Sequence, residues 1–385
     1  MRTPSSPLQP PFIAAMMIPT GVGARQGGFG GDATPALNLL ASVCDGLITH
    51  PNVANAAVFQ QLPANALYVE GYGLDQFFRK RWGLQPVRSN RVGVVLDAGM
   101  APAMATLHHN VLNAVRTVYG VDILPPVTTG APLRLTLETG TSGATTGTLQ
   151  NPQVLLAACR QAEQQGATAI ALAVHLSGLC EDDDAETAYQ TSGGVDPIGG
   201  LEAILSHFVV SQLGIPCANA PVFSREQAEP AFDRLVDPRT AAEFIAPTFL
   251  PCVLQGLARA PRFVPLPPVA DSAGVLTLQA VDALVTPYNA LGGLPVLSCL
   301  EAGIPVIAVA DNPTVLAMDP GAFNRWRTAR QNGRLLIAAS YYEAAGILSA
   351  LKAGLPLPAA PHEHSCAGSF VPPPGVASLV PSPAL

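Results

Sequence analysis

Lysine is nearly absent from this chain of 385 residues, which contains only Lys80 and Lys352. A phosphate-binding P-loop needs a lysine directly after its glycine-rich turn, and neither lysine has that position. Pyridoxal phosphate needs a lysine for its Schiff base, and neither lysine follows a predicted strand or a glycine loop. The sequence therefore argues against P-loop nucleotide hydrolysis and against pyridoxal phosphate as a cofactor.

Charged and aromatic residues are also scarce, at 12% and 6% of the chain, and the net charge is −7. The one basic run is at residues 79–81, so a nucleic-acid partner is not expected. No apolar stretch reaches the about 18 residues of a membrane-spanning helix, so no membrane partner is expected. The apolar run at residues 12–18 predicts a first strand and not a signal peptide. A small-molecule substrate is the expected partner, and the composition is compatible with a homo-oligomer.

The seven cysteines are scattered singly, and no C-x-x-C pair occurs. An odd number of isolated cysteines is typical of a reducing compartment, so we expect a cytoplasmic location. Cys217 ends a predicted strand, and a pair of strand-end cysteines would indicate a cofactor-free racemase. The alternative is that such cysteines are small buried core residues.

Short apolar runs alternate with amphipathic stretches along the chain, which predicts an α/β protein with buried parallel strands. We expect Rossmann-like parallel sheets flanked by helices, with two subdomains around a central cleft. The predicted strands are 12–19, 46–49, 91–97, 133–138, 167–175, 216–220, 282–286, 305–310 and 335–339. The predicted helices are 34–43, 103–119, 152–165, 199–213, 239–257, 295–302 and 341–353.

We divide the chain into one α/β domain from residues 12–130 and 270–354 and a second from 131–265. Two segments that begin at Asp45 and Asp282 resemble each other, which indicates an internal repeat in the first domain. Alternatively, any βα unit ends in similar polar turn residues. The Pro-rich tail at 355–385 is predicted to be extended or disordered, and its His362 and His364 are either metal ligands or chance histidines.

The candidate ligand-binding residues follow predicted strands, because ligands of open parallel sheets bind beyond the carboxyl ends of the strands. So many polar, glycine-rich strand ends predict one cleft lined by several loops. The candidates are Thr20, Gly21, Gly23, Arg25, Gly27, Gly28, Asp32, Asn52, Asn55, Thr141, Ser142, Gly143, Thr145, Thr146, Asn289, Gly292, Gly293, Asp311 and Asn312.

Two of these loops have the composition of anion cradles. In IPTGVGARQGGFGGDATPALNLLA, residues 18–41, glycine N–H groups can converge on an anion, Arg25 can add a charged fork, and Asp32 can cap the next helix. GTSGATTGT is a second such loop, in which Ser142 is alternatively a nucleophile. The ligand is therefore predicted to be anionic.

The segment GGVDPIGGLEAILSHF contains the best acid–base residues, Asp196, Glu202 and His207, and His50 follows another predicted strand. Near a helix N-terminus that opens on a cleft, such residues can transfer protons or hold a divalent metal. Alternatively, Glu202 caps its own helix and His207 packs against the sheet. The acidic run at 181–186 favours a solvated loop over a cation site.

The motifs IPTGVGARQGGFGGDA, LITHPNVANAA, GTSGATTGT, GVDPIGGLEAILSHF and TFLPCVLQGLARAP resemble an uncharacterised family, domain of unknown function 3326. The resemblance covers roughly Ile13 to Met318 and implies no activity. The Pro-rich tail looks like an addition to the family pattern.

The main functional hypothesis is an enzyme that hydrolyses or cleaves a C–N or C–O bond of a small polar anionic metabolite, by acid–base or metal-assisted chemistry. The alternatives are an isomerase or racemase of a small carboxylate, and a non-catalytic nucleotide or metabolite sensor. A dinucleotide oxidoreductase ranks below these, because Gln26 stands where the third glycine of G-x-G-x-x-G belongs.

Overall fold

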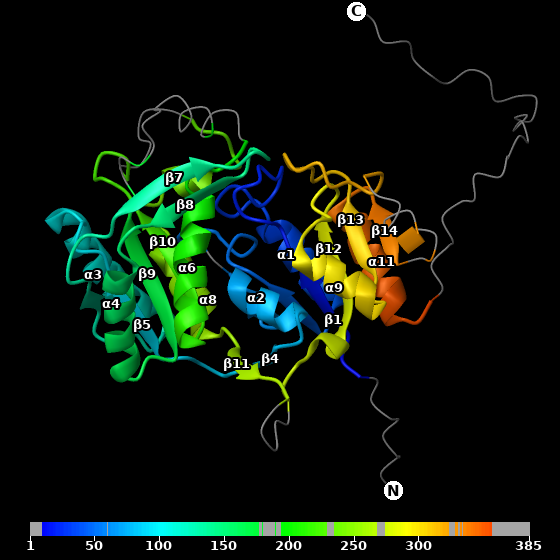
Figure 1. Cartoon of the computed structure of the whole chain (residues 1–385), viewed down its shortest axis with the longest axis horizontal. Helices are drawn as coiled ribbons and strands as arrows, with labels where there is room; N and C mark the ends of the chain where they lie inside the picture. Colours follow the sequence, from blue (N-terminus) through cyan, green and yellow to red (C-terminus); the bar gives the residue numbers. More distant parts are fainter. Residues whose placement is uncertain are drawn as a thin grey trace, which may run out of the picture.

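Two parallel β-sheets flanked by helices make up the protein (Figure 1), so the predicted α/β fold is confirmed. The computed structural model describes residues 10–59, 61–176, 179, 189, 194–228, 235–267, 274–322, 328–329, 332 and 334–355. One sheet has six strands in the order β14-β13-β12-β1-β2-β3, and the other has four in the order β10-β9-β5-β6.

The six-stranded sheet combines the two ends of the chain. Its strands are β1 (Ile13–Met16), β2 (Gly46–Thr49), β3 (Ala66–Tyr68), β12 (Val281–Pro287), β13 (Val306–Val309) and β14 (Leu335–Ala338). Every residue of β1 is buried, because this strand lies between β2 and β12. Counted in chain order, the strands run 6-5-4-1-2-3 across the sheet, which is the order of doubly wound sheets.

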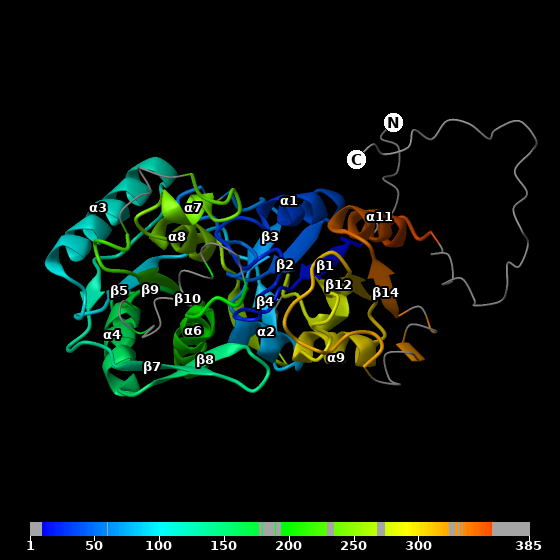
Figure 2. The same cartoon turned by 90° about the horizontal axis from the view of Figure 1, so that it is seen from above.

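Helices cover both faces of this sheet (Figure 2). On one face, α1 (Thr34–Val43) packs beside α11 (Tyr341–Lys352). On the other face, α2 (Gly71–Phe78) packs beside α9 (Leu294–Ala302). The predictions for α1, α9 and α11 are confirmed, whereas the glycines of α2 hid that helix from the sequence pattern.

The four-stranded sheet is likewise enclosed on both faces (Figure 2). Its strands are β5 (Val92–Leu96), β6 (Val127–Thr128), β9 (Ala169–His175) and β10 (Cys217–Val222). The helices α3 (Pro102–Tyr119), α7 (Ala241–Phe244) and α8 (Leu250–Ala258) lie on one face, and α4 (Pro152–Gln164) and α6 (Gly199–Leu213) lie on the other. The hairpin of β7 (Leu135–Thr139) and β8 (Thr145–Leu149) covers α6. The predicted helix at 239–257 is broken into α7 and α8, which are separated by a segment that contains Pro247.

The chain passes from one sheet to the other through β4 (Trp82–Gln85) and returns through β11 (Arg262–Pro265). These two strands pair antiparallel, and the short 3₁₀ helix η1 (Leu278–Ala280) then leads into β12. Strand β5 pairs with β9, so β5 and the helix after it belong to the four-stranded sheet. The predicted boundary at residue 130 put them in the first domain, because hydrophobic periodicity does not tell which sheet a strand joins.

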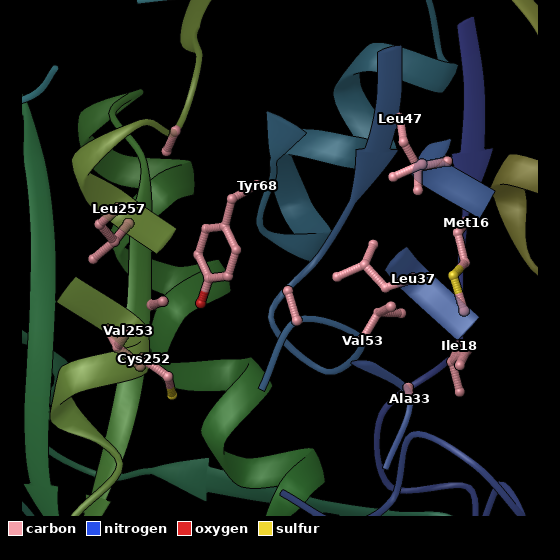
Figure 3. Packing of buried hydrophobic residues seen from close by; sticks show 14 of the residues in the cluster. Met16, Ile18, Ala33, Leu37, Leu47, Val53, Tyr68, Cys252, Val253 and Leu257 are labelled. Atoms are coloured by element: carbon pink, nitrogen blue, oxygen red, sulfur yellow. The ribbon is translucent and has the colours of Figure 1, made fainter. Parts of the chain in front are cut away.

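The two sheets share their hydrophobic core. One buried cluster contains Met16 from β1 and Ala171 from β9, and a second contains Ile48 from β2 and Leu172 from β9. Figure 3 shows Tyr68 of β3 between the sheets, with Val253 and Cys252 of α8 beside it. A continuous core of this kind holds the loops of both sheets in fixed relation to each other.

The two segments of the predicted repeat have equivalent positions beside β1. Asp45 precedes β2 and accepts a hydrogen bond from Phe12 N at 2.8 Å, and Asp282 of β12 accepts one from Ile13 N at 2.8 Å. Both aspartates therefore fix the start of the central strand from opposite sides. Common descent of the two segments stays a prediction.

Close packing of α6 against β8 depends on Gly200, because a Cβ at this position would overlap the main-chain carbonyl of Thr145. Gly200→Ala is expected to destabilise the protein by about 3 kcal/mol, measured by urea unfolding, since backbone cannot move aside as a side chain can. Gly346→Ala in α11 is the matched control, because its Cβ would meet nothing within 4 Å. The control is expected to stabilise the protein by up to about 1 kcal/mol. Equal effects of the two substitutions would contradict this account.

Candidate active site

A cavity of about 230 Å³ lies between the two sheets, lined by strand-end residues of both. A single water molecule needs only about 10–15 Å³, so this cavity has room for a small metabolite. Polar and ionisable side chains from several elements meet there. They are Thr20, His50, Asn52, Asn55, Tyr68, Glu70, Tyr189, Asp196, Glu202, Ser206, His207, Asn219, Gln227, Glu243 and Cys252.

Glu70 follows β3 and caps the N-terminus of α2. Its carboxylate accepts hydrogen bonds from Tyr72 N at 2.8 Å and from Gly73 N at 3.2 Å. Only 2% of its surface is exposed, and burial raises its pKa to about 8 although the two N–H groups oppose the shift. At neutral pH this carboxyl therefore holds a proton for most of the time.

His207 of α6 contacts Glu70, with Nε2 at 3.0 Å from Oε1. The His207 side chain is 43% exposed, and burial of the rest of it lowers its pKa, to about 4. Because burial raises the pKa of Glu70 and lowers that of His207, a proton shared by the pair is favoured on Glu70 near neutral pH. Its two members can act as a proton donor and a proton acceptor at adjacent points of the cavity.

His50 is 8% exposed and follows β2. Its Nε2 accepts a hydrogen bond from Ile18 N at 3.0 Å, so the proton of the neutral ring is on Nδ1. Burial lowers its pKa to about 4, and the nearby His207 adds to the shift. His50 is therefore a neutral hydrogen-bond donor at physiological pH.

Asp196, Glu202 and Glu243 also line the cavity. Asp196 accepts from Ile198 N at 2.9 Å and Gly199 N at 3.1 Å, so it caps the start of α6. Glu202 accepts from Asn219 Nδ2 at 3.1 Å. Burial, aided by the charge of Asp196, raises the pKa of Glu202 above its usual range.

Glu243 of α7 accepts from Gly30 N at 2.7 Å. Burial raises the pKa of Glu243 to about 8, and the charge of Asp196 contributes. The remaining accessible surface of Glu202 and Glu243 lines the cavity. Both carboxyls are thus poised to lose a proton when a positive charge approaches.

The glycine-rich loop after β1 uses several of its N–H groups within the protein. Gly27 N donates to Asp32 Oδ1 at 2.6 Å, Gln26 N to Asn312 Oδ1 at 2.9 Å, and Arg25 N to Pro313 O at 3.1 Å. The Arg25 guanidinium lies 3.4 Å from Asp311 O, and that side chain is exposed. These donors are already occupied, which weighs against the predicted anion cradle.

The second predicted cradle is part of the β7–β8 hairpin. Thr141, Ser142 and Gly143 are exposed in its turn, whereas Thr145 and Thr146 belong to strand β8. Thr145 Oγ1 donates to Asp196 O at 2.8 Å and accepts from Gly200 N at 3.2 Å. The predicted loop after this strand is present at residues 140–144, but it is the turn of an antiparallel hairpin and not the carboxyl end of a strand in a parallel sheet.

Of the predicted site residues, Thr20, Gly28, His50, Asn52, Asn55, Asp196, Glu202 and His207 line the cavity. The other predicted ligand residues do not line it: Gly21, Gly23, Arg25, Gly27, Asp32, Thr141, Ser142, Gly143, Thr145, Thr146, Asn289, Gly292, Gly293, Asp311 and Asn312. Several of these hold neighbouring loops together. Asn289, for example, donates to Thr314 O and accepts from Thr314 N, both at 2.7 Å.

Sequence reasoning missed Glu70, Tyr68, Tyr189, Asn219 and Glu243 as lining residues. Glu70 had a usable signal, because it directly follows a strand in YVEGYG. Glu243 had none, since α7 is far along the chain and reaches the cavity only through tertiary packing.

No group of three or more His, Cys, Asp or Glu within the described ranges could hold a metal ion. The acidic run at 181–186 and the tail residues His362 and His364 lie outside those ranges. Burial raises the pKa of the Cys252 thiol to about 12 and also raises that of Cys217, so neither is a thiolate near neutral pH. Protonated thiols of this kind weigh against a racemase that uses two cysteines.

The fold and cavity define an α/β protein with a cavity lined by ionisable side chains between two parallel sheets. The chain belongs to the family described as protein of unknown function (DUF3326), whose model matches residues 13–360. This match confirms the resemblance seen in the sequence motifs. The family description assigns no activity.

The chain is 40% identical over 349 residues to an uncharacterized lipoprotein of Synechococcus sp., and the match covers 89% of this chain and 92% of the relative. No solved structure matches the chain. Among the described residues, no helix is long and apolar enough to cross a membrane.

Proposed function

We propose that the protein is an acid–base enzyme that hydrolyses or cleaves a C–N or C–O bond of a small polar metabolite. The observation that carries this proposal is the Glu70–His207 pair at 3.0 Å in a cavity that also contains His50 and Glu202. Ionisable groups with pKa values shifted in opposite directions are typical of catalytic sites.

In the hydrolytic form of the proposal, His207 accepts a proton from a water molecule as the water oxygen bonds to the substrate carbon. Protonated Glu202 donates its proton to the leaving nitrogen or oxygen as the bond to carbon breaks. Return of a proton from His207 to Glu202 closes the cycle. Glu70 positions the His207 imidazole, and His50 donates a hydrogen bond to a substrate oxygen.

A non-catalytic metabolite sensor is the rival interpretation. Purified protein is incubated with a small-molecule extract, and depleted compounds are identified by mass spectrometry. We expect the wild type to consume at least one compound, and Glu202→Gln and His207→Ala to lose about 100-fold or more of that rate, a typical contribution of acid–base catalysis. Glu163→Gln is the control, because this residue is exposed on α4.

If no compound is consumed and both variants keep the ligand affinity of the wild type, the result supports the sensor interpretation and contradicts the enzyme proposal. A dinucleotide oxidoreductase has less support, because the loop after β13 binds the glycine-rich loop. Val315 N donates to Val22 O at 2.9 Å and Gln26 N donates to Asn312 Oδ1 at 2.9 Å, so part of the glycine-rich loop is already engaged within the protein.

The cytoplasmic location stays part of this proposal. The relative from Synechococcus sp. is named an uncharacterized lipoprotein. The absence of nucleic-acid and membrane partners, and homo-oligomer formation, also stay predictions.

A further inference from the structure

The cavity has an unusual charge inventory. Glu70, Asp196, Glu202 and Glu243 line it, and no lysine or arginine does so among the residues that the structure describes. Burying a carboxyl group costs free energy, and proteins reduce that cost by raising its pKa, as Glu70 and Glu243 show. A ligand that brings its own positive charge would offset this cost.

An uncharged side chain in the cavity wall also favours a ligand that donates hydrogen bonds. Asn219 donates through Nδ2 to Glu202, but its Oδ1 is buried and has no hydrogen-bond donor in the described structure. An unmet buried acceptor calls for a ligand with N–H donors. An ammonium group has three such donors and no acceptor.

Aromatic rings complete the wall of the cavity. Tyr68, Tyr189, Phe223 and Phe249 line it, and Tyr189 stacks on Phe29 with ring centroids 5.0 Å apart. The faces of aromatic rings attract organic cations. Carboxyls and aromatic rings together are the chemistry that recognises an amine, and divalent cations gain little from the rings.

An anionic ligand would find few free donors here. The N–H groups at the start of α6 donate to Asp196 and Thr145, and Gly30 N donates to Glu243. These are the positions at which a glycine loop and a helix N-terminus would otherwise hold a phosphate or carboxylate. In this protein, carboxylate and hydroxyl side chains of the chain itself accept these hydrogen bonds.

We propose that the cavity binds a small primary amine as its ammonium ion, held by Glu243 and Asn219 Oδ1 against the aromatic wall. The inference deepens the proposed function by naming its substrate class, since the scissile bond would then belong to an amine-bearing compound. Because the positive charge stabilises the ionised form of Glu243, binding at neutral pH releases a proton to the buffer.

The test uses ethylamine, ethanolamine and 1,4-diaminobutane as probes of the full-length protein, with propionate, propionamide, inorganic phosphate and Mg²⁺ for comparison. Amines are expected to raise the melting temperature, and calorimetry in two buffers of different ionisation enthalpy is expected to show proton release. Glu243→Gln is expected to weaken amine binding about tenfold or more, the effect of losing one charge pair. Glu163→Gln on the surface of α4 is expected to leave it unchanged.

Stabilisation by propionate, phosphate or Mg²⁺ but not by any amine would overturn the inference, as would amine binding that Glu243→Gln leaves unchanged. Failure of the proposed function is distinguishable from this result. If amines bind but no compound is turned over, the site is an amine receptor without catalysis, and the inference stands while the enzyme proposal fails. Melting temperatures of the unliganded variants check that they are folded.

Discussion

Gly71→Ala is expected to reduce the rate of the proposed reaction about 100-fold without removing any ionisable group. A Cβ at Gly71 would overlap His207 Nε2, the atom that contacts Glu70. Gly71 is the first residue of α2 and needs no positive φ, so the backbone accepts alanine there. The imidazole, as the end of a flexible side chain, is expected to swing away, and the rate loss is that of a displaced acid–base group.

The direct readout for Gly71→Ala is the titration of His207 by NMR, which needs no substrate. We expect the pKa of His207 to rise from about 4 towards its usual value of 6.5 as the displaced ring gains water. Gly73→Ala is the matched control on the same helix, because its Cβ would overlap the Phe263 ring and not His207. An unchanged His207 titration in Gly71→Ala, or the same change in both variants, would contradict the positioning role of Gly71.

The second large effect expected is a fall in stability as the pH rises from about 6.5 to 8. Burial raises the pKa of Glu70 and Glu243 from 4.5 to about 8, so the native state binds more protons than the unfolded chain between these values. Stability is then lost as the pH rises through this window. Each carboxyl contributes at most about 1.4 kcal/mol per pH unit.

His50 opposes the carboxyls at lower pH. Its pKa is lowered from 6.5 to about 4, so the unfolded chain binds the extra proton in that window and stability rises with pH there. The histidine partly offsets the two carboxyls below pH 6.5, and only the carboxyl effect remains above it. The stability curve is therefore expected to fall more steeply on the alkaline side of pH 6.5 than on the acid side.

Urea unfolding between pH 5.5 and 8 measures this curve, and Glu70→Gln isolates one contribution. The variant cannot ionise at this position, so its stability is expected to fall less steeply above pH 6.5 than that of the wild type. A wild-type curve that is flat up to pH 8, or equal slopes for the two proteins, would show that Glu70 is not a buried, protonated carboxyl.

Residues of the site that are close together in the chain could be predicted from the sequence. Residues that reach the site from distant segments could not. His50, Asn52 and Asn55 were found because they follow β2, and the rule on strand ends needs only local pattern. Asp196, Glu202 and His207 were found because they surround the start of one helix. Glu243 was missed because its partner Gly30 lies 213 positions away.

The glycine-rich loop was predicted to bind an anion, and here too contacts with distant residues could not be foreseen. Its composition indicated free N–H donors, and small residues between a strand and a helix do favour such a loop. Whether the donors are free depends on what else approaches them. Asp32 lies within the loop, but Asn312 is 286 residues from Gln26, and only the folded chain brings it there.

The sequence by itself determined the α/β class, most of the helices and strands, and the family. A strand that is buried on both faces has a continuous apolar run, and an amphipathic helix has apolar residues every three or four positions. Both patterns can be recognised from neighbouring residues in the sequence. Only the tertiary structure decided that β5 joins the second sheet, that Glu70 meets His207, and that carboxyls and aromatic rings line the cavity. Those results depend on contacts between distant segments, and both burial and pKa follow from such contacts.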